Sequence, residues 1–228
     1  LKEKEEQLLA TNAYALLTSD YFPFSKTQCA VFKGTDRAVF LDKREFAGPI
    51  YSQIENAVDF VLRNIRLGAI IDGLVRKETY ELPPEAIREM IVNAHCHRNL
   101  LDESCIQVAV YDDRLEITSP GGLYNGMTYE EVMNGHSKIR NRGIANIFSQ
   151  MGLVEAWGSG IKRIFNAAKE YGLPEPRFQE FDNMFRVELF RNSLPIAQKN
   201  EDIGETSEKH RRNIGEASEK HQITGLND

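Results

Sequence analysis

The chain has 228 residues, of which 41% are hydrophobic and 27% charged, and its formal net charge is −6. This length fits one large domain or one and a half ordinary ones, with enough apolar side chains for a core. No apolar run reaches the roughly 20 residues that cross a bilayer, and no secretory leader pattern is visible. The negative charge argues against a protein that coats nucleic acid non-specifically, although a local basic patch stays open.

The cysteines are few and unevenly spaced, at Cys29, Cys96 and Cys105. Their odd number and spacing favour reduced thiols in a cytoplasmic protein. The sequence begins at Leu1 rather than at a methionine, so a missing upstream domain also stays open.

The first part of the chain alternates between helical and strand-like patterns. Residues 1–19 read as a charged helix followed by a short apolar one, and residues 27–41 as two short strands around a glycine turn. An amphipathic helix is predicted over residues 50–65, because apolar side chains recur there every three or four positions. A half-buried strand is expected over residues 74–81.

Residues 82–99, LPPEAIREMIVNAHCHRN, predict the helix around which the chain is organised. Pro83 and Pro84 suit its first turn, where a missing N–H costs nothing. Glu89 and Asn93 are four apart, hence neighbours on one face, beside an apolar stripe. Such an oxygen pair suits Mg²⁺ shared with phosphate and water, and the glutamate could also activate a water molecule. The alternative is that both side chains simply face solvent.

The second part of the chain predicts a hairpin, three helices and two closing strands. The expected strands are residues 105–111 and 114–119, then 176–181 and 184–190; the expected helices are residues 128–133, 141–151 and one that starts at residue 161. From residue 193 the sequence becomes polar and holds an imperfect repeat, IGETSEKHRRN and IGEASEKHQIT, typical of a linker.

Two glycine-rich turns flank these elements. Gly121 and Gly122 follow a strand, and the sequence Gly158-Ser159-Gly160 opens a helix. A glycine turn at a helix N-terminus presents free N–H groups to phosphate. With the carboxamide of Asn93, this order predicts a nucleoside triphosphate site. The alternative is that these glycines only form ordinary turns at the ends of helices and strands.

The ordered set resembles the Bergerat ATP-binding fold of the GHKL superfamily. More closely, REMIVNAHCHRN, DDRLEITSPGGL and SKIRNRGIANIFSQMGLVEAWGSGIKRI resemble a divergent bacterial group of RecG-like helicase C-terminal or transcriptional-regulator proteins. In that group a Schlafen/AlbA-like DNA-binding domain precedes the GHKL-like module. The resemblance covers about residues 11–192.

The resemblance implies an α/β fold of two α+β layers, with a mixed, largely antiparallel sheet and helices on one face. It implies that residues 1–68 are the end of an upstream AlbA/Schlafen-like domain plus a small α/β connector. Residues 69–192 would be the GHKL-like ATP-binding module, and residues 193–228 a polar linker.

Carried over by position, the resemblance assigns roles to eight residues. Glu89 would match the water-activating glutamate and Asn93 the magnesium ligand. The other nucleotide-binding positions would be Ser119, Gly121, Gly122, Gly158, Ser159 and Gly160. Ser119 departs from the pattern, because the ATPases place there an aspartate that bonds the adenine amino group. A serine hydroxyl can accept that bond, but without a carboxylate's charge-assisted strength.

The expected function is an ATP-binding regulatory module, with Mg²⁺, in a DNA-associated transcriptional regulator. DNA would be contacted by flanking domains, and a homo-oligomer is one possible state of the protein. One alternative is a degenerate fold that serves only as a dimerisation scaffold, and another is an ATPase that drives conformational change. A motor helicase is disfavoured because the sequence has no P-loop.

Two further clusters are ambiguous. His95, Cys96 and His97 do not share a helix face, which disfavours zinc, and the role of the His97-Arg98 pair typical of the family does not follow from the residues. The basic run of residues 140–142 either meets phosphate or is a solvated face.

Overall fold

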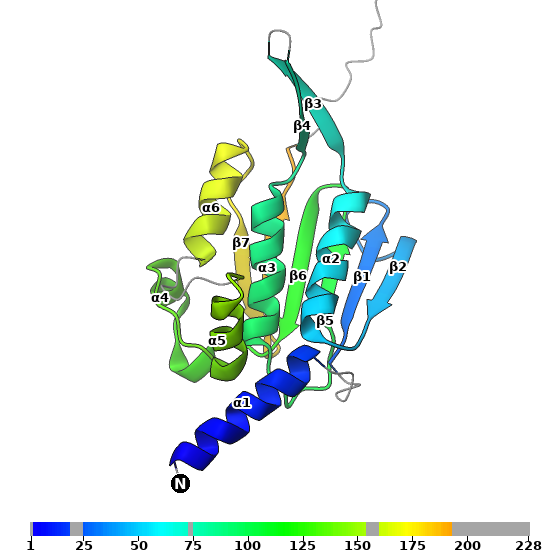
Figure 1. Cartoon of the computed structure of the whole chain (residues 1–228). Coiled ribbons are helices and arrows are strands. Elements are labelled where there is room, and N and C mark those ends of the chain that lie inside the picture. The colour runs from blue at the N-terminus through cyan, green and yellow to red at the C-terminus, as the bar shows by residue number, and fades with distance from the viewer. Residues whose placement is uncertain (1, 19–24, 73–74, 154–159, 193–228) are drawn as a thin grey trace, which may run out of the picture. The chain divides into compact units, whose positions relative to one another are not determined.

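The computed structural model describes residues 2–18, 25–72, 75–153 and 160–192. Figure 1 shows its elements along the chain. The helices are α1 (Lys2–Thr18), α2 (Ile50–Asn64), α3 (Pro84–His97), α4 (Tyr129–Met133), α5 (Arg142–Gln150) and α6 (Gly160–Glu170), with a 3₁₀ turn, η1 (Tyr124–Gly126). The strands are β1 (Thr27–Phe32), β2 (Phe40–Phe46), β3 (Leu67–Asp72), β4 (Val75–Tyr80), β5 (Ile106–Val110), β6 (Arg114–Pro120), β7 (Arg177–Phe181) and β8 (Met184–Phe190).

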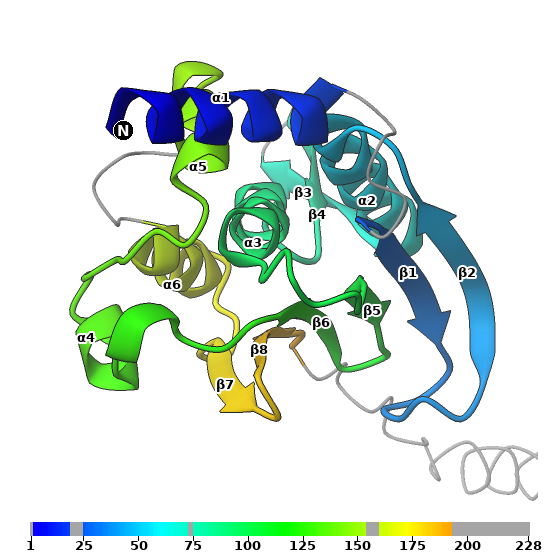
Figure 2. The same ribbon diagram turned by 90° about the horizontal axis from the view of Figure 1, so that it is seen from below.

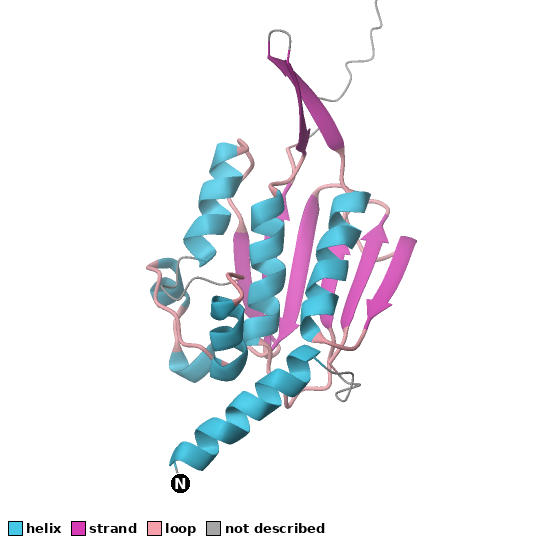
Figure 3. Ribbon diagram, viewed as in Figure 1, coloured by secondary structure: helices cyan, strands magenta, loops and turns pink. Residues whose placement is uncertain are grey.

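Six of these strands form one mixed sheet in the order β2-β1-β5-β6-β8-β7. Strands β1 and β5 are parallel, and the other neighbours are antiparallel. The view from below shows the helices gathered on one face of this sheet (Figure 2), and Figure 3 separates the two layers by colour. The two-layer α+β fold with a largely antiparallel sheet is therefore confirmed.

The main differences from the sequence-based expectations lie in the first 80 residues. The two helices expected in residues 1–19 form one continuous helix, α1. The second expected strand corresponds to β2, which runs to Phe46 rather than ending at Leu41. Strand β2 lies at the sheet edge and is largely exposed, so its charged residues carry no alternating apolar signal.

The strand expected over residues 74–81 is β4, but its partner β3 was not predicted. The two strands form a separate hairpin with Leu67 opposite Tyr80. Because β3 follows α2 within three residues, its apolar start reads as a continuation of the helix. The expected polar linker, residues 193–228, lies outside the described residues.

Helix α3 lies at the centre of the helical layer. It packs against α2, α6, β5 and β6, and Ile87, Met90 and Ile91 are each at most 1% exposed. Burying side chains of this size stabilises the fold by about 1.5–3 kcal/mol each. Helix α2 contributes Ile54 and Val61 to the same core. The apolar stripes seen in the sequence are thus the faces that join helices to sheet.

The sheet face away from the helices carries buried charges. Glu116 and Glu188 lie opposite each other on β6 and β8, and their side chains are 2% exposed. Arg114 contacts both carboxylates at 3.2 Å, while Arg37 and Arg177 pair with one each. Like charges placed opposite each other destabilise a strand pair. The arginines offset this repulsion, so the two strands depend on the ion-pair network.

We expect Glu188→Gln to destabilise the fold by about 2 kcal/mol, less than the roughly 3–5 kcal/mol of a fully buried pair because the arginines reach solvent. Urea unfolding monitored by circular dichroism measures this change. Glu103→Gln, in an exposed loop, is the control and should change little. An unchanged midpoint for Glu188→Gln would contradict the structural role of the network.

Candidate functional site

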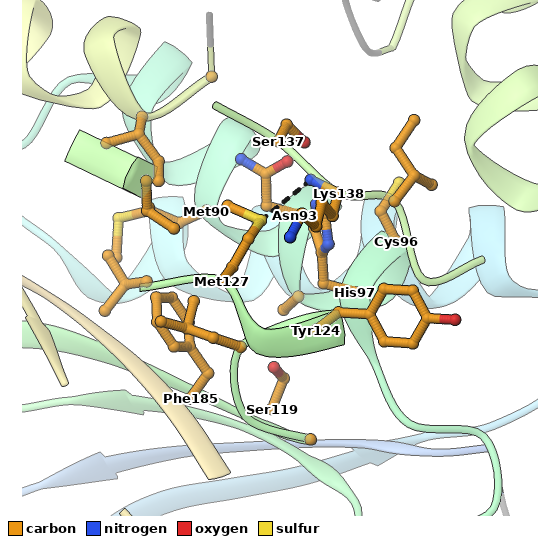
Figure 4. Close-up of a pocket in the computed structure, with 18 of the residues that line it drawn as sticks. Met90, Asn93, Cys96, His97, Ser119, Tyr124, Met127, Ser137, Lys138 and Phe185 are labelled. Carbon is orange, nitrogen blue, oxygen red and sulfur yellow. Dashed lines mark hydrogen bonds between the residues drawn. The ribbon is translucent and has the colours of Figure 1, made fainter. Parts of the chain in front are cut away.

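A cavity of about 190 Å³ lies among α3, the sheet, η1, α5 and α6 (Figure 4). Its walls are mainly apolar, with Met90, Ile117 and Val187 among the lining side chains. Polar groups enter it from α3 and from the end of β6. A largely apolar pocket with a few polar groups is the usual form of a ligand site.

Six of the eight residues singled out in the sequence line this one cavity. They come from three separate parts of the chain: Glu89, Asn93, Ser119, Gly121, Gly122 and Gly160. The remaining two, Gly158 and Ser159, lie outside the described residues. The fold therefore brings together residues that are up to 71 positions apart (160 minus 89) in the sequence.

Glu89 and Asn93 contact each other at the cavity wall. The Asn93 side-chain amide donates to Glu89 Oε1 at 3.0 Å, and Arg163 Nη1 lies 3.5 Å from Glu89 Oε2. Glu89 is only 6% exposed, so these partners offset the desolvation of its charge. Because the nitrogen of the Asn93 carboxamide is engaged by Glu89, its oxygen is the atom placed to accept a cation or a donor.

Gly160 brings the start of α6 against this carboxylate. A Cβ on Gly160 would overlap Glu89 Oε1 and approach the Asn93 amide. Only glycine therefore allows this close approach. A carboxylate at the N-terminal end of a helix is also stabilised by the helix dipole. Glu89 thus lies where the dipole of α6 attracts negative charge.

The end of β6 forms another wall. Gly121 has φ of +99°, and a Cβ there would come within 2.9 Å of the Asn99 side chain. A Cβ on Gly122 would overlap the Glu180 carboxylate, which accepts from the Leu123 N–H at 2.9 Å. Gly121 is thus required by its positive φ and its contact with Asn99, whereas a side chain at Gly122 would displace the exposed Glu180 side chain.

Ser119 is 4% exposed, and its hydroxyl points toward the cavity (Figure 4). It makes no hydrogen bond to another residue within the described ranges, so the hydroxyl is available to a ligand.

His97 also lines the cavity, although the sequence analysis had given it no role at this site. It follows Asn93 by four residues, as Asn93 follows Glu89, so the three side chains share one stripe of α3. Burial and the neighbouring positive charge of Arg140 lower the pKa of His97. It is therefore neutral at pH 7. The regular spacing of four was the signal that could have found it.

The basic run of residues 140–142 has structural contacts at two of its three positions. The Asn141 amide donates to the carbonyls of Cys96 and Arg98 at 2.9 and 2.8 Å, which satisfies the C-terminal end of α3. Arg140 donates to the Gly122 carbonyl at 2.7 Å and lies over the Tyr124 ring. The solvated-face reading is therefore wrong for these two side chains.

The other polar residues of α3 are structural. Thr27 donates its hydroxyl proton to Gln53 Oε1, so its oxygen accepts from His95 Nε2 at 3.3 Å. Burial raises the pKa of the Cys96 thiol to about 12, which makes it unreactive. Within the described ranges no three His, Cys, Asp or Glu side chains gather as metal ligands.

The second half of the cavity wall, from β6 to β8, lies in a segment that matches a known family. Residues 103–189 match the family described as "Putative ATP-dependent DNA helicase recG C-terminal". The match covers less than half of the chain and shows a similarity to that family. Glu89 and Asn93 precede the matched segment. This similarity points to an ATP-binding, helicase-related domain.

A solved structure shows the same fold. The DIP2311 protein from Corynebacterium diphtheriae is 22% identical over 78% of this chain, with a TM-score of 0.67. The aligned part spans 35% of that protein, so this chain covers about a third of its length. No match was found among curated proteins. None of the helices in the described ranges has the length and apolarity needed to cross a membrane.

The buried histidine of α3 makes the stability of the fold depend on pH. Burial, and to a smaller degree the charge of Arg98, lowers the pKa of His95 to about 3. The unfolded chain takes up this proton below about pH 6.5 and the folded chain does not, so stability falls as the pH drops below that value. At pH 5 the loss from this group is about 2 kcal/mol.

We therefore expect His95→Gln, which cannot titrate, to lose about 2 kcal/mol less stability between pH 7 and pH 5 than the natural chain. Urea unfolding at the two pH values measures the difference. His136→Gln is the control, because His136 is exposed. Equal pH dependence in all three proteins would show that His95 is not buried in its neutral form.

Proposed function

We propose that this chain is an ATP-binding regulatory module of a DNA-associated transcriptional regulator. The observation that carries the proposal is that Glu89, Asn93, Ser119 and the glycines at 121, 122 and 160, from three segments of the chain, line one cavity. The match to the RecG C-terminal family supports the same ligand class. DNA contacts would come from flanking domains. The protein would be cytoplasmic, and a homo-oligomer is one possible state.

The apolar cavity suits the base of the nucleotide. Its volume of about 190 Å³ is below the roughly 300–1,000 Å³ of ordinary ligand pockets, so it would hold the base and leave the phosphates at its mouth. Met90 and Ile117 would contact the flat faces of the ring system, and Ser119 its polar edge.

The polar stripe of α3, formed by Glu89, Asn93 and His97, is suited to bind phosphates together with Mg²⁺. Mg²⁺ takes oxygen ligands and keeps several waters, so one protein ligand plus phosphate oxygens is a common arrangement. Asn93 fits this role because Glu89 engages its nitrogen and leaves its oxygen toward the cavity. When bound, the ion would neutralise phosphate charge. Glu89 would orient a water molecule at the same site. The proposal therefore includes ATP hydrolysis as a second activity, but it does not include motor helicase activity.

A scaffold without nucleotide is the second candidate. It is favoured by Glu89, whose carboxylate already lies at the N-terminus of α6, where a phosphate would otherwise be attracted. It is also favoured by Ser119 in place of a carboxylate. In that case the domain would hold its neighbours together, and the cavity would have no nucleotide ligand.

Calorimetric titration of ATP with and without Mg²⁺ separates these candidates. We expect weak binding that requires Mg²⁺ and is at least about tenfold weaker in Asn93→Ala, because the metal ligand is lost. Asn56→Ala is the control, since that amide is on the exposed side of α2. No heat up to millimolar ATP from the folded chain would reject the nucleotide site and favour the scaffold.

The serine at the base-binding position predicts relaxed specificity. A hydroxyl can donate or accept, whereas a carboxylate only accepts. We expect ATP and inosine triphosphate, whose bases present an amino group and a carbonyl at the same position, to bind within about threefold of each other.

We expect Ser119→Asp to favour ATP over inosine triphosphate by at least about tenfold, because a carboxylate accepts only from the amino group. Ser149→Asp adds the same charge at an exposed position of the cavity wall and serves as the control. A strong preference for ATP in the natural chain would show that Ser119 does not read the base.

A further inference from the structure

A second cavity lies beside the first, between α1 and the segment that leads into α5. Its volume is about 650 Å³, within the range of ordinary ligand pockets. Leu16, Leu100 and Ile144 supply apolar walls. It shares part of its wall with the first cavity, through Tyr124, Ser137, Lys138 and Ile139. An occupant would therefore touch residues that also line the first cavity.

The charges that line this second cavity are all positive. Lys138, Arg140 and Arg142 belong to its wall, and no aspartate or glutamate does. Within the described ranges neither arginine forms an ion pair with a carboxylate. The buried Nε of Arg140 has no hydrogen-bond partner there either. Arg140 donates only to the Gly122 carbonyl and lies over the Tyr124 ring. In a chain with a net charge of −6, a positive cluster with no carboxylate in its wall indicates an anion.

The third cation is only weakly compensated. Lys138 donates to the Asn125 carbonyl at 3.0 Å. A hydrogen bond from the backbone of Thr128 and, to a smaller degree, the charge of Lys138 lower the pKa of Glu131 on α4. Lys138 therefore interacts with one carboxylate, that of Glu131, which lies outside the cavity wall. Most of the positive charge in the cavity is therefore left to the two arginines.

Helix α5 adds its own positive end to the same place. It begins at Arg142, has no acidic residue in its first turn, and its N-cap residue Asn141 makes no side-chain cap. Asn141 is instead turned toward the end of α3. Arg142 and Gly143, which carry the first N–H groups of α5, both line the cavity, and the N-cap side chain does not accept from them. Arginine at this end of a helix is electrostatically unfavourable unless an anion is present.

We propose that the second cavity is a binding site for the phosphate group of a small phosphorylated molecule, separate from the proposed nucleotide site. Phosphate fits better than carboxylate because its double charge matches three cations and the end of a helix. Guanidinium groups also bind phosphate oxygens in pairs. The apolar part of the ligand would lie against Leu16, Leu100 and the Tyr124 ring.

The test is calorimetric titration of sodium pyrophosphate into the full chain at low salt. We expect binding that is about tenfold weaker in Arg142→Gln, because one charge-assisted contact is lost. Arg88→Gln, at an exposed position of α3 outside both cavities, is the matched control. Asn93→Ala should also bind normally, since that residue belongs to the other cavity.

Lys138→Gln provides a second variant if Arg142→Gln does not fold, and it should weaken binding in the same direction. Several results would overturn the proposal: no binding at millimolar pyrophosphate, equal binding by Arg142→Gln and the natural chain, or loss in Asn93→Ala instead. ATP that competes with pyrophosphate would assign the cations to the nucleotide's own phosphates. A short single-stranded oligonucleotide that binds where pyrophosphate does not would indicate nucleic acid as the ligand.

Discussion

The architecture depends on one helix that must be apolar on most of its circumference and polar on one stripe. Helix α3 contacts helices on two sides and the sheet beneath, so an unsatisfied polar group on it would be costly. Each polar residue of the stripe therefore has a partner or opens into a cavity. Glu89 is engaged by Asn93 and Arg163, and the end of the helix is satisfied by Asn141. The site exists because α3 cannot bury this stripe completely.

The glycines follow from the same constraint. Gly160 allows α6 to start against the Glu89 carboxylate, and Gly121 and Gly122 allow the end of β6 to pass close to Asn99 and Glu180. Each contact closes the cavity on one side without a side chain entering it. Close approach explains glycine at positions 121 and 160, and a positive φ adds to it at Gly121.

The sequence revealed most helices and strands because periodicity is a local signal, whereas the fold class followed from the family resemblance. The four-residue spacing of Glu89 and Asn93 by itself places these two side chains on one face of a helix. The glycine turns joined them through their order in the sequence, whereas Ser119 joined them only through the family resemblance, since nothing local brings β6 next to α3.

What sequence reasoning missed depends on tertiary contacts. The polar edge strand β2 and the hairpin partner β3 have no alternating apolar pattern of their own. Asn141 reads as part of a basic run, and only the fold shows that it completes α3. The charge on the open sheet face, where Glu116 and Glu188 oppose each other, is likewise invisible in a linear pattern.

The parallel pairing of β1 with β5 has a consequence for how the chain can be divided. Thr27 pairs with Ile106, so strands on either side of residue 68 belong to one sheet. A piece that began at residue 69 would leave β5 with a bare edge of unpaired N–H and C=O groups, a template for aggregation. Such distant pairing also slows folding, since the intervening segment must be ordered before the two strands can meet. The segment before α3 thus supplies two strands of the sheet, and a fragment that folds on its own must keep both parts.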